Sequence, residues 1–487
     1  MVELRARQVG QNVATIRKLA MSIIRDPPPQ FELTVPVVIV GAGACGLTAA
    51  LAAHDQGTEA LVLERDKRLW GSTSMSLGAM CAVGSREQRA HGVEDNVDLF
   101  VDDVLAKTEG LADLVLAKLI GTESGPTVDW LAERHQVPLQ LDFKWIGLGH
   151  SKSRLHLPPG RNGEELLTLL ANACARSGVE IMTEAHVSDL YVDERNRVLG
   201  VRIQRPGGIV EHLGCNAIIL ATCGFGGNHS LVKQYIPEIA GAKYFGHEGN
   251  QGEGILWGSA LGGALAEMSA YQGLGTLADP HQVVVPHPLM IEGGFLTNIN
   301  GERFTHELEN ISGMCVPVLA QPHGLAWVIF DEQRNLTCLS HSVEQQQLVE
   351  AGAIKYSSTW GGLEQICNLP AGSLEHENNM INIARKTGVK DKLGRSFLGL
   401  TPLQAPYCAV RVGGALFHTQ GGLKVNSQAR VIRVDGSPLP NIFAGGGAAS
   451  SISGPNVTGY LPAVGLSMAI TLGRIAGLNA AKLGELK

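Results

Sequence analysis

The sequence predicts an α/β fold with more than one domain, and three observations predict it. The chain has 487 residues, which is more than one ordinary domain holds. Its composition, 44% hydrophobic with 60 glycines, is that of a globular protein whose backbone approaches a ligand closely. An apolar strand, a glycine-rich turn and an Ala/Leu-rich helix follow one another near the start of the chain, within residues 35–55. This succession is typical of an α/β nucleotide-binding unit.

The charge and the cysteines narrow the class of protein. A net charge of −7 argues against a nucleic-acid-binding protein. The nine cysteines are scattered without a Cys-x-x-Cys pair, so we expect no metal site and a reducing, cytoplasmic location. No apolar run approaches 18 residues, and the first residues lack the apolar core of a secretory signal, so no integral membrane span is expected.

Residues 1–25 have the spacing of a helix, with Val13, Ile16, Leu19 and Ile23 between basic residues. Such a helix packs on the body of the protein or on a partner subunit, or it serves as a membrane-surface or targeting segment. The three prolines at 27–29 end it and form a linker.

The turn GAGACG at 41–46 carries the most informative local pattern. It lies between the apolar strand 37–40 and a helix, and a second strand, 60–63, ends at Glu64. A Gly-x-Gly-x-x-Gly turn in this place, with an acid about 20 residues on, is the fingerprint of dinucleotide binding. The glycines let backbone N–H groups and the helix N-terminus face a pyrophosphate, and the acid accepts a hydrogen bond from a ribose hydroxyl.

The segment RLWGSTSMSLGAM at 68–80 indicates which dinucleotide is bound. It resembles the Gly-Gly-Ser-Thr stretch that lines the flavin in the superfamily of fumarate reductase and succinate dehydrogenase flavoproteins and 3-ketosteroid dehydrogenases, with Trp70 in place of one glycine. The resemblance is to the single-chain, soluble branch and continues through five further motifs: ATCGFGGN (221–228), NQGEGILWGSALGGAL (250–265), HTQGGLKVN (418–426), NIFAGGGAA (441–449) and GRIAG (473–477).

The resemblance implies FAD as the cofactor. We expect it to be non-covalent, since 68–80 holds no His of the kind that attaches flavin in some relatives. NAD is disfavoured because the chain has one dinucleotide fingerprint, so the electron acceptor lies outside it. Gly447 stands where many relatives have a Glu that touches the cofactor. The fingerprint and the resemblance together assign the FAD contacts to Gly41, Ala42, Gly43, Cys45, Gly46, Glu64, Arg65, Gly71, Ser72, Thr73, Gly78, Ala79, Val187, Thr222, Gly224, Asn228, Gly446, Val464 and Leu466.

The resemblance also implies a Rossmann-like FAD-binding domain with an inserted α+β cap domain. We expect the FAD-binding domain at 1–270, with a helical extension at 1–30, and again at 415–487. The cap, 271–414, is expected to contact the substrate and to be rich in helix near 342–390. Residues 179–203 predict strand, strand, turn and strand. Val187 within them contacts adenine in relatives, although a place in the sheet core is equally compatible with its side chain.

The phrase NINGERF at 298–304 opens a motif whose catalytic continuation is missing. In fumarate reductases an Arg eight positions after the Arg of this phrase delivers a proton, and counting from Arg303 gives Ile311. Ketosteroid dehydrogenases use a Tyr in this region, but the sequence has none between 303 and 355. Arg303 and Glu307 are therefore expected to form a structural ion pair in the cap. Three other histidines are candidates for the proton role: His281, His287 and His306.

A second departure concerns the group that holds the substrate. Fumarate reductases clamp a carboxylate with an Arg 14 residues before the Arg of the final Gly-Arg, and counting back from Arg474 gives Tyr460. A phenol donates one hydrogen bond, which suits a neutral carbonyl oxygen. Ketosteroid dehydrogenases place a Tyr near this position, one residue away by ungapped counting. His418 keeps the family's His-Thr-x-Gly-Gly position, which faces substrate.

The sequence therefore predicts an FAD-dependent oxidoreductase that acts on a small molecule. Tyr460 and His418 are the predicted catalytic residues, and the favoured reaction exchanges a hydride between flavin N5 and a C–C bond α,β to a ketone. One alternative is a fumarate-reductase-like enzyme whose carboxylate substrate is held by another cation, such as Arg154 or Arg161. A second is a non-catalytic flavin-binding subunit. The direction of reaction, the electron acceptor and the oligomeric state stay open.

Overall fold

The computed structural model describes residues 23–26, 30–143, 146–340 and 342–484. The chain divides into two compact units. Unit 1 comprises the described residues of Met1–Asn228, Gly246–Ala270 and His418–Lys487, and unit 2 those of His229–Phe245 and Tyr271–Phe417. Most of the helix expected at 1–25 falls outside the described residues.

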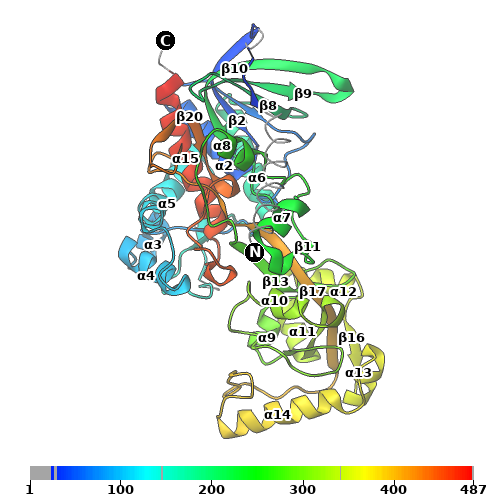
Figure 1. Ribbon diagram of the computed structural model, residues 1–487. Helices are drawn as coiled ribbons and strands as arrows, with labels where there is room; N and C mark the ends of the chain where they lie inside the picture. Colours follow the sequence, from blue (N-terminus) through cyan, green and yellow to red (C-terminus); the bar gives the residue numbers. More distant parts are fainter. Residues whose placement is uncertain (1–22, 27–29, 144–145, 341, 485–487) are drawn as a thin grey trace. The chain divides into compact units, whose positions relative to one another are not determined.

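Unit 1 is built on a nine-stranded sheet (Figure 1). Its middle is parallel, because β2 pairs with both β3 and β10, β3 with β7, and β10 with β20. The strands β8, β9 and β10 follow one another as antiparallel neighbours. The strand bounds are β1 Ile23–Ile24, β2 Leu33–Val40, β3 Ala60–Leu63, β7 Glu180–Met182, β8 His186–Val192, β9 Val198–Gln204, β10 Val210–Leu220, β19 Arg430–Ile432 and β20 Pro438–Ala444.

The strand β1 corrects the end of the expected N-terminal helix. Ile23 pairs with Leu190 and Ile24 with Tyr191, in parallel with β8. Both residues are β-branched, which favours a strand over a helix. Edge pairing on the sheet therefore wins over helical periodicity at this point.

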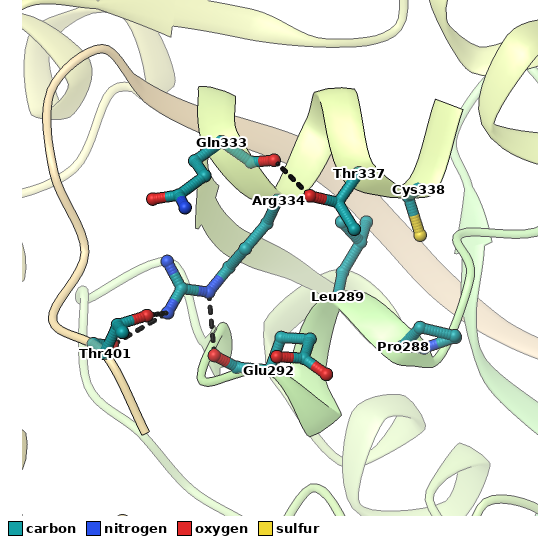
Figure 2. Close-up of a pocket in the computed structure, with 8 residues that line it drawn as sticks. All are labelled: Pro288, Leu289, Glu292, Gln333, Arg334, Thr337, Cys338 and Thr401. Atoms are coloured by element: carbon teal, nitrogen blue, oxygen red, sulfur yellow. Dashed lines mark hydrogen bonds between the residues drawn. The ribbon is translucent and has the colours of Figure 1, made fainter. Parts of the chain in front are cut away.

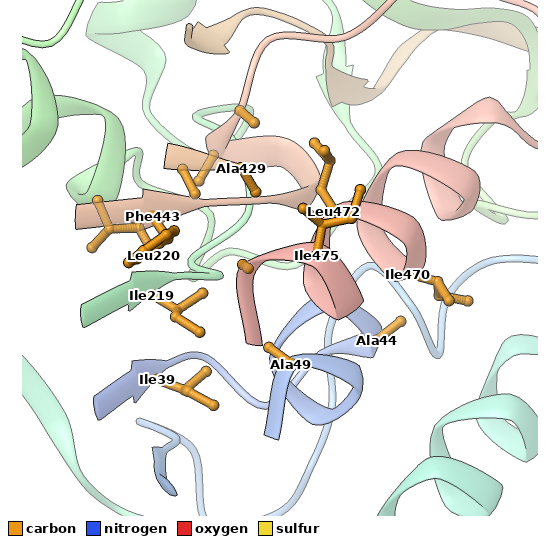
Figure 3. Close-up of a cluster of buried hydrophobic side chains, with 14 of the residues drawn as sticks. Ile39, Ala44, Ala49, Ile219, Leu220, Ala429, Phe443, Ile470, Leu472 and Ile475 are labelled. Atoms are coloured by element: carbon orange, nitrogen blue, oxygen red, sulfur yellow. The ribbon is translucent and has the colours of Figure 1, made fainter. Parts of the chain in front are cut away.

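Two helices cover one face of the parallel strands. In α2, Ala44–Asp55, every residue from Ala44 to Ala53 is buried, and α2 packs lengthwise against α15, Val464–Gly484. Figure 3 shows Ile39 of β2 and Ile219 of β10 directed toward Ala49 of α2 in this core. By length and composition α15 could cross a membrane, but 67% of its apolar window is buried inside unit 1, as in a core helix.

The remaining elements of unit 1 are short strands and peripheral helices. Their bounds are β4 Met80–Cys81, β5 Gln140–Leu141, β6 Leu155–Leu157, β12 Leu265–Ala266, β18 Gly422–Leu423, α3 Arg86–Ala90, α4 Val97–Lys107, α5 Leu114–His135, α6 Gly163–Arg176 and α8 Glu253–Ala260.

Unit 2 is an α+β body around a six-stranded sheet whose long strand is β17. The segment 229–245, expected in the FAD-binding part, belongs to this unit because β11 within it pairs with β17. The bounds are β11 Lys243–Tyr244, β13 Tyr271–Ala278, β14 Phe295–Thr297, β15 Leu325–Asp331, β16 Lys355–Ser357, β17 Tyr407–Thr419, α7 His229–Tyr235, α9 Pro288–Ile291, α10 Cys315–Leu319, α11 Glu332–Leu339, α12 Val343–Glu350, α13 Trp360–Cys367 and α14 Ser373–Thr387.

Candidate functional site

The glycine-rich turn after β2 is compact enough to require its glycines. Gly41 has a φ of +106°, and a Cβ there would lie 2.5 Å from the carbonyl oxygen of Ala221. A Cβ at Gly46 would lie 1.9 Å from the carbonyl oxygen of Gly41. Any side chain at either position would push β2, α2 and the end of β10 apart.

The N-terminus of α2 is open to an anion. Gly43 is the N-cap residue, it makes no side-chain capping bond, and the first turn holds no acid. The N–H of Ala44 donates to Thr73 Oγ1 at 3.0 Å, which brings the 68–80 segment to the same turn. Uncapped N–H groups and the positive end of the helix dipole favour a phosphate group at this place.

Glu64 stands where the ribose end of a dinucleotide is expected. It follows β3 directly and is 8% exposed. One carboxylate oxygen accepts from the N–H of Ala42 at 2.9 Å, and the other accepts from the N–H of Asp66 at 3.0 Å. Each oxygen keeps a lone pair, so the carboxylate is held in place and can still accept from a hydroxyl.

A chain of hydrogen bonds joins the 68–80 segment to the turn after β10. Asn250 Nδ2 donates to Ser72 Oγ at 2.9 Å, and Ser72 Oγ lies 3.2 Å from Cys223 Sγ. Cys223 stands where the resembled motif has glycine, and its φ of +63° is one that glycine adopts more readily. Burial raises the pKa of the Cys223 thiol, and hydrogen bonds from Ser72 and from the Gly224 backbone partly oppose this.

Steric crowding explains why this chain has glycine at 447, where many resembled proteins have Glu. A Cβ at Gly447 would lie 2.7 Å from the backbone nitrogen of Gly224 and 3.1 Å from the carbonyl carbon of Cys223. The backbone of the turn after β10 thus fills the space into which a Glu side chain would start. The missing carboxylate follows from how closely these two turns approach each other.

The other predicted cofactor residues have varied surroundings. Val187 and Val464 are buried in the hydrophobic core of unit 1, and Leu466 packs against that core. Arg65 forms an ion pair with Glu253 at 3.5 Å, and Asn228 donates to the carbonyl oxygen of Gln251 at 3.1 Å. Gly78 and Gly446 have φ values of +72° and +58°, Gly71 has +151°, and Ala79 is buried beside β6.

These residues fit an FAD. The glycines let a pyrophosphate approach the backbone of the turn closely, and the N-cap Gly43 has no side chain to occupy the helix end. Glu64 is held at the carboxyl end of β3. Thr222 Oγ1, beside the same turn, is buried and has no protein partner among the described residues. A cofactor oxygen or a water would satisfy that hydroxyl. The roles of single residues toward the cofactor stay predictions.

The structure brings the two predicted catalytic residues together. The rings of His418 and Tyr460 lie edge to face, with centroids 5.6 Å apart. Both approach the backbone of Gly465 in the first turn of α15, where a Cβ would lie 3.6 Å from His418 Nε2 and 4.0 Å from Tyr460 Oη. No described protein group is within hydrogen-bonding distance of His418 Nε2.

Burial favours the neutral form of both side chains at physiological pH. Burial lowers the pKa of His418 to about 4, and the carbonyl of Thr419 opposes this only weakly. Burial raises the pKa of the Tyr460 phenol, and the backbone of Ala463 partly offsets it. Two neutral hydrogen-bond donors side by side suit an oxygen that gains negative charge during a reaction.

One residue at this site escaped the sequence analysis. Gln420 is 4% exposed, and its Nε2 lies 2.9 Å from His418 Nδ1. The signal was visible in HTQGG, where the resembled motif has Met between Thr and Gly. An amide in place of a thioether brings a hydrogen-bonding group next to the conserved-looking His.

Both arginines named for the carboxylate alternative already pair with carboxylates of the protein. Arg154 is fully buried and forms ion pairs with Asp95, through Nε at 2.8 Å, and with Asp103. Arg161 forms an ion pair with Asp142 at 2.8 Å. A substrate carboxylate would have to displace Asp95 or Asp103 to reach the buried Arg154. Arg161 is partly exposed, and its charge is already shared with Asp142.

In unit 2 the NINGERF phrase leads into a buried ion network. Glu307 is fully buried and accepts from Arg303 Nε at 2.9 Å, from Arg395 NH1 at 2.9 Å and from the N–H of Leu296 at 3.0 Å. Arg303 also pairs with Asp391. The expected ion pair between Arg303 and Glu307 is present, and it ties the loop after β14 to the segment after α14.

The positions considered for proton transfer have different surroundings. Ile311 packs in an apolar cluster with Leu274 and Phe417 and carries no proton. His306 Nδ1 accepts from the N–H of Leu308 at 3.1 Å. His287 has both ring nitrogens buried without a protein partner among the described residues, and burial, with the nearby Arg395, lowers its pKa to about 4.

A cavity of about 140 Å³ in unit 2 is not a convincing ligand site (Figure 2). Arg334, its one cation, uses Nε on the carbonyl of Glu292 at 2.8 Å and NH2 on the carbonyl of Thr401 at 2.8 Å, and NH1 pairs with Asp331 at 2.6 Å. With its nitrogens engaged, Arg334 braces the surrounding loops.

Comparison with known proteins agrees with this geometry. The family model described as FAD binding domain matches residues 36–459. A probable fumarate reductase of Shewanella frigidimarina is 27% identical over 453 residues, covering 92% of this chain and 75% of its own length. A urocanate reductase of Eggerthella lenta is 25% identical over 466 residues, covering 94% of this chain and 76% of its own length.

Solved structures show the same fold. The open conformation of a flavocytochrome c3 fumarate reductase superposes with a TM-score of 0.82 at 26% identity, covering 97% of this chain and 81% of that one. The 3-ketosteroid Δ4-(5α)-dehydrogenase of Rhodococcus jostii RHA1 superposes with a TM-score of 0.75 at 24% identity, covering 94% of this chain and all of that one. The predicted α/β flavoprotein fold is confirmed.

Proposed function

The chain belongs to the FAD binding domain family, and from this membership we propose that it exchanges a hydride between flavin and a carbon–carbon bond beside a ketone. It is an FAD-dependent oxidoreductase, and the relatives that it resembles act on carbon–carbon double bonds. The proposal adds the class of carbonyl group that activates this bond.

One observation supports a ketone as the activating carbonyl group. At the position where fumarate reductases have the carboxylate-binding Arg, this chain has Tyr460, whose ring lies against His418. A planar guanidinium binds both oxygens of a carboxylate, whereas a neutral phenol and a neutral imidazole each donate a single hydrogen bond. Two single donors fit one carbonyl oxygen better than a carboxylate charge.

The reaction assigns distinct tasks to these residues. Tyr460 Oη and His418 Nε2 donate to the carbonyl oxygen and stabilise its enolate-like charge as the β-carbon gains or loses a hydride. When bound, FAD supplies the hydride acceptor or donor at N5. The proton at the α-carbon is exchanged with water or a side chain, because Ile311 carries none. Glu64 and the N-terminus of α2 hold the dinucleotide.

A carboxylate substrate is the second candidate, and the names of the relatives favour it. The proteins similar to this chain include reductases named for fumarate and for urocanate. Their similarity of 25–27% leaves the substrate side chains free to differ, and Arg154 and Arg161 are already paired with carboxylates. A carboxylate would therefore need a clamp formed by other groups.

An anaerobic titration tests the proposal. The purified holoenzyme is mixed with saturated cyclic ketones, ketosteroids and carboxylic acids, and bleaching of the flavin absorption is recorded; the photoreduced enzyme is then offered the unsaturated counterparts. We expect ketones or enones to change the flavin redox state. Reoxidation by unsaturated acids alone would favour the carboxylate substrate instead. If neither ketones nor acids change the flavin redox state, the ketone and the carboxylate proposals are both contradicted.

A further inference from the structure

Gln420 lies at the centre of a buried hydrogen-bond chain that ends on His418. Its Nε2 is 2.9 Å from His418 Nδ1, and its Oε1 accepts from Ser453 Oγ at 3.1 Å. Ser453 Oγ is in turn 3.1 Å from Ser451 Oγ. Gln420, Ser451 and Ser453 are all at most 5% exposed, so water does not compete for these bonds.

The backbone holds this chain in place. The N–H of Gln420 donates to the carbonyl of Ala270 at 2.8 Å, and the N–H of Ser451 donates to the carbonyl of Gln420 at 2.9 Å. The side chain of Gln420 is therefore held at both ends, by His418 Nδ1 and by Ser453 Oγ. A fixed amide presents either its NH2 group or its oxygen to the imidazole.

The direction of that amide decides the tautomer of His418. If the NH2 group faces Nδ1, the neutral ring must carry its proton on Nε2; if the oxygen faces Nδ1, the proton lies on Nδ1. The competing acceptor for an Nδ1 proton is the carbonyl of Thr419, which is 3.5 Å away and too distant for a good hydrogen bond. The structure has the first arrangement, with Nε2 of Gln420 toward His418 Nδ1 and Oε1 toward Ser453 Oγ.

We propose that Gln420 is a positioning residue that fixes His418 as the Nε2–H tautomer. The imidazole then presents a donor on the side where Tyr460 and Gly465 lie, and it cannot act there as a proton acceptor. This rests on the proposed function, because a donor at Nε2 is what a carbonyl oxygen requires. Met at this position, as in the resembled motif, offers no hydrogen-bond donor to Nδ1.

Nitrogen-15 NMR of histidine-labelled holoenzyme tests the assignment, with a His418→Gln variant to identify the resonances. In the wild-type enzyme we expect a protonated Nε2 and an unprotonated Nδ1. In Gln420→Glu, whose carboxylate accepts from Nδ1, we expect the proton to move to Nδ1, and the pH at which His418 titrates to rise. Gln420→Met keeps the shape without the amide, and we expect a mixture of tautomers.

Activity provides the second readout. Losing the donor at Nε2 should lower kcat/KM for a ketone substrate about 10²-fold in Gln420→Glu, as for an oxyanion donor. A wild-type His418 resonance with the proton on Nδ1 would overturn the inference, even if the Gln420 variants fail to fold. This outcome is separate from the proposed function, because NMR needs no substrate and an inactive panel would leave the tautomer assignment standing.

Discussion

Tyr460 and Arg154 show how far the role of a side chain depends on its neighbours. Tyr460 is next to an imidazole and has its pKa raised by burial, so it stays a neutral donor. Arg154 is a cation, but Asp95 and Asp103 surround it and neutralise it. The cation is therefore a structural group, whereas the phenol remains available to a substrate.

Replacing Tyr460 by Phe tests the donor directly. Removing one hydrogen bond to a developing oxyanion should lower kcat/KM for a ketone about 10²-fold, with FAD content unchanged. Steady-state kinetics and the flavin-to-protein absorbance ratio measure both effects. The control is Tyr407→Phe in unit 2, where Tyr407 stacks on Trp360 at 3.7 Å. Unchanged kinetics in Tyr460→Phe would move the assignment to a carboxylate substrate.

At the scale of residues, the sequence could predict those whose role follows from a motif and not those whose role follows from a fold contact. The position of Tyr460 follows by counting back from Arg474, and that of Glu64 by counting forward from the glycine turn. The pairing of Arg154 with Asp95 joins positions 59 residues apart, which no local pattern reveals. The sequence shows that Gln420 replaces a Met of the resembled motif, but only the folded structure shows its contact with His418 Nδ1.

Among the elements, β2, the glycine turn and α2 together form one structural unit that creates the anion site. The turn can be tight because β10 runs parallel to β2 and brings Ala221 against Gly41. Gly43, the N-cap residue, offers the first turn of α2 no side-chain cap of its own, and in the described part of the chain only the N–H of Ala44 is bonded to a side chain, that of Thr73. The strand, turn and helix therefore create the anion site together.

Gly41→Ala and Gly57→Ala make a matched pair at the two ends of α2. Both glycines have positive φ, +106° and +73°, but a Cβ at Gly57 meets nothing within 4 Å. Gly57→Ala should cost only about 1 kcal/mol of backbone strain and keep its FAD. Gly41→Ala, whose Cβ would lie 2.5 Å from the Ala221 oxygen, should be purified with little FAD and a lower Tm. Equal FAD content in both variants would show that the turn tolerates a Cβ.

The strands and helices around the glycine turn were predictable because their signals are local. The strand at 60–63 and the three strands within 179–203 appear as the pattern indicates. The segment 229–245 could not be placed, because pairing with β17 joins it to residues 172 positions away along the chain. The helix at 1–25 was wrong at Ile23 and Ile24 for the same reason, since sheet pairing outweighs local periodicity.

On the scale of the whole molecule, histidines whose pKa values are lowered by burial make stability depend on pH. Burial lowers the pKa of His150, His287 and His418 to about 4 in the folded protein, from an ordinary value of 6.5. Between these values the unfolded chain binds more protons than the folded one, so stability falls as pH drops from 6.5 toward 4. The pKa of Glu307 is lowered, chiefly by Arg303 against the cost of burial, so its contribution is lost at still lower pH.

His287 allows this dependence to be measured for one group. Both of its ring nitrogens lack protein partners among the described residues, so His287→Leu removes a titrating group without breaking a hydrogen bond to the protein. Above pH 6.5 the variant and the wild type should have similar Tm values, and below it the variant should become progressively the more stable. The difference should grow by up to about 1.4 kcal/mol per pH unit, one proton's worth, until pH reaches about 4. Thermal unfolding with excess FAD from pH 7.5 to 4.5 measures it. Parallel Tm curves would mean that His287 does not stay neutral in the folded protein, because a water or a buried acid then satisfies its charged form.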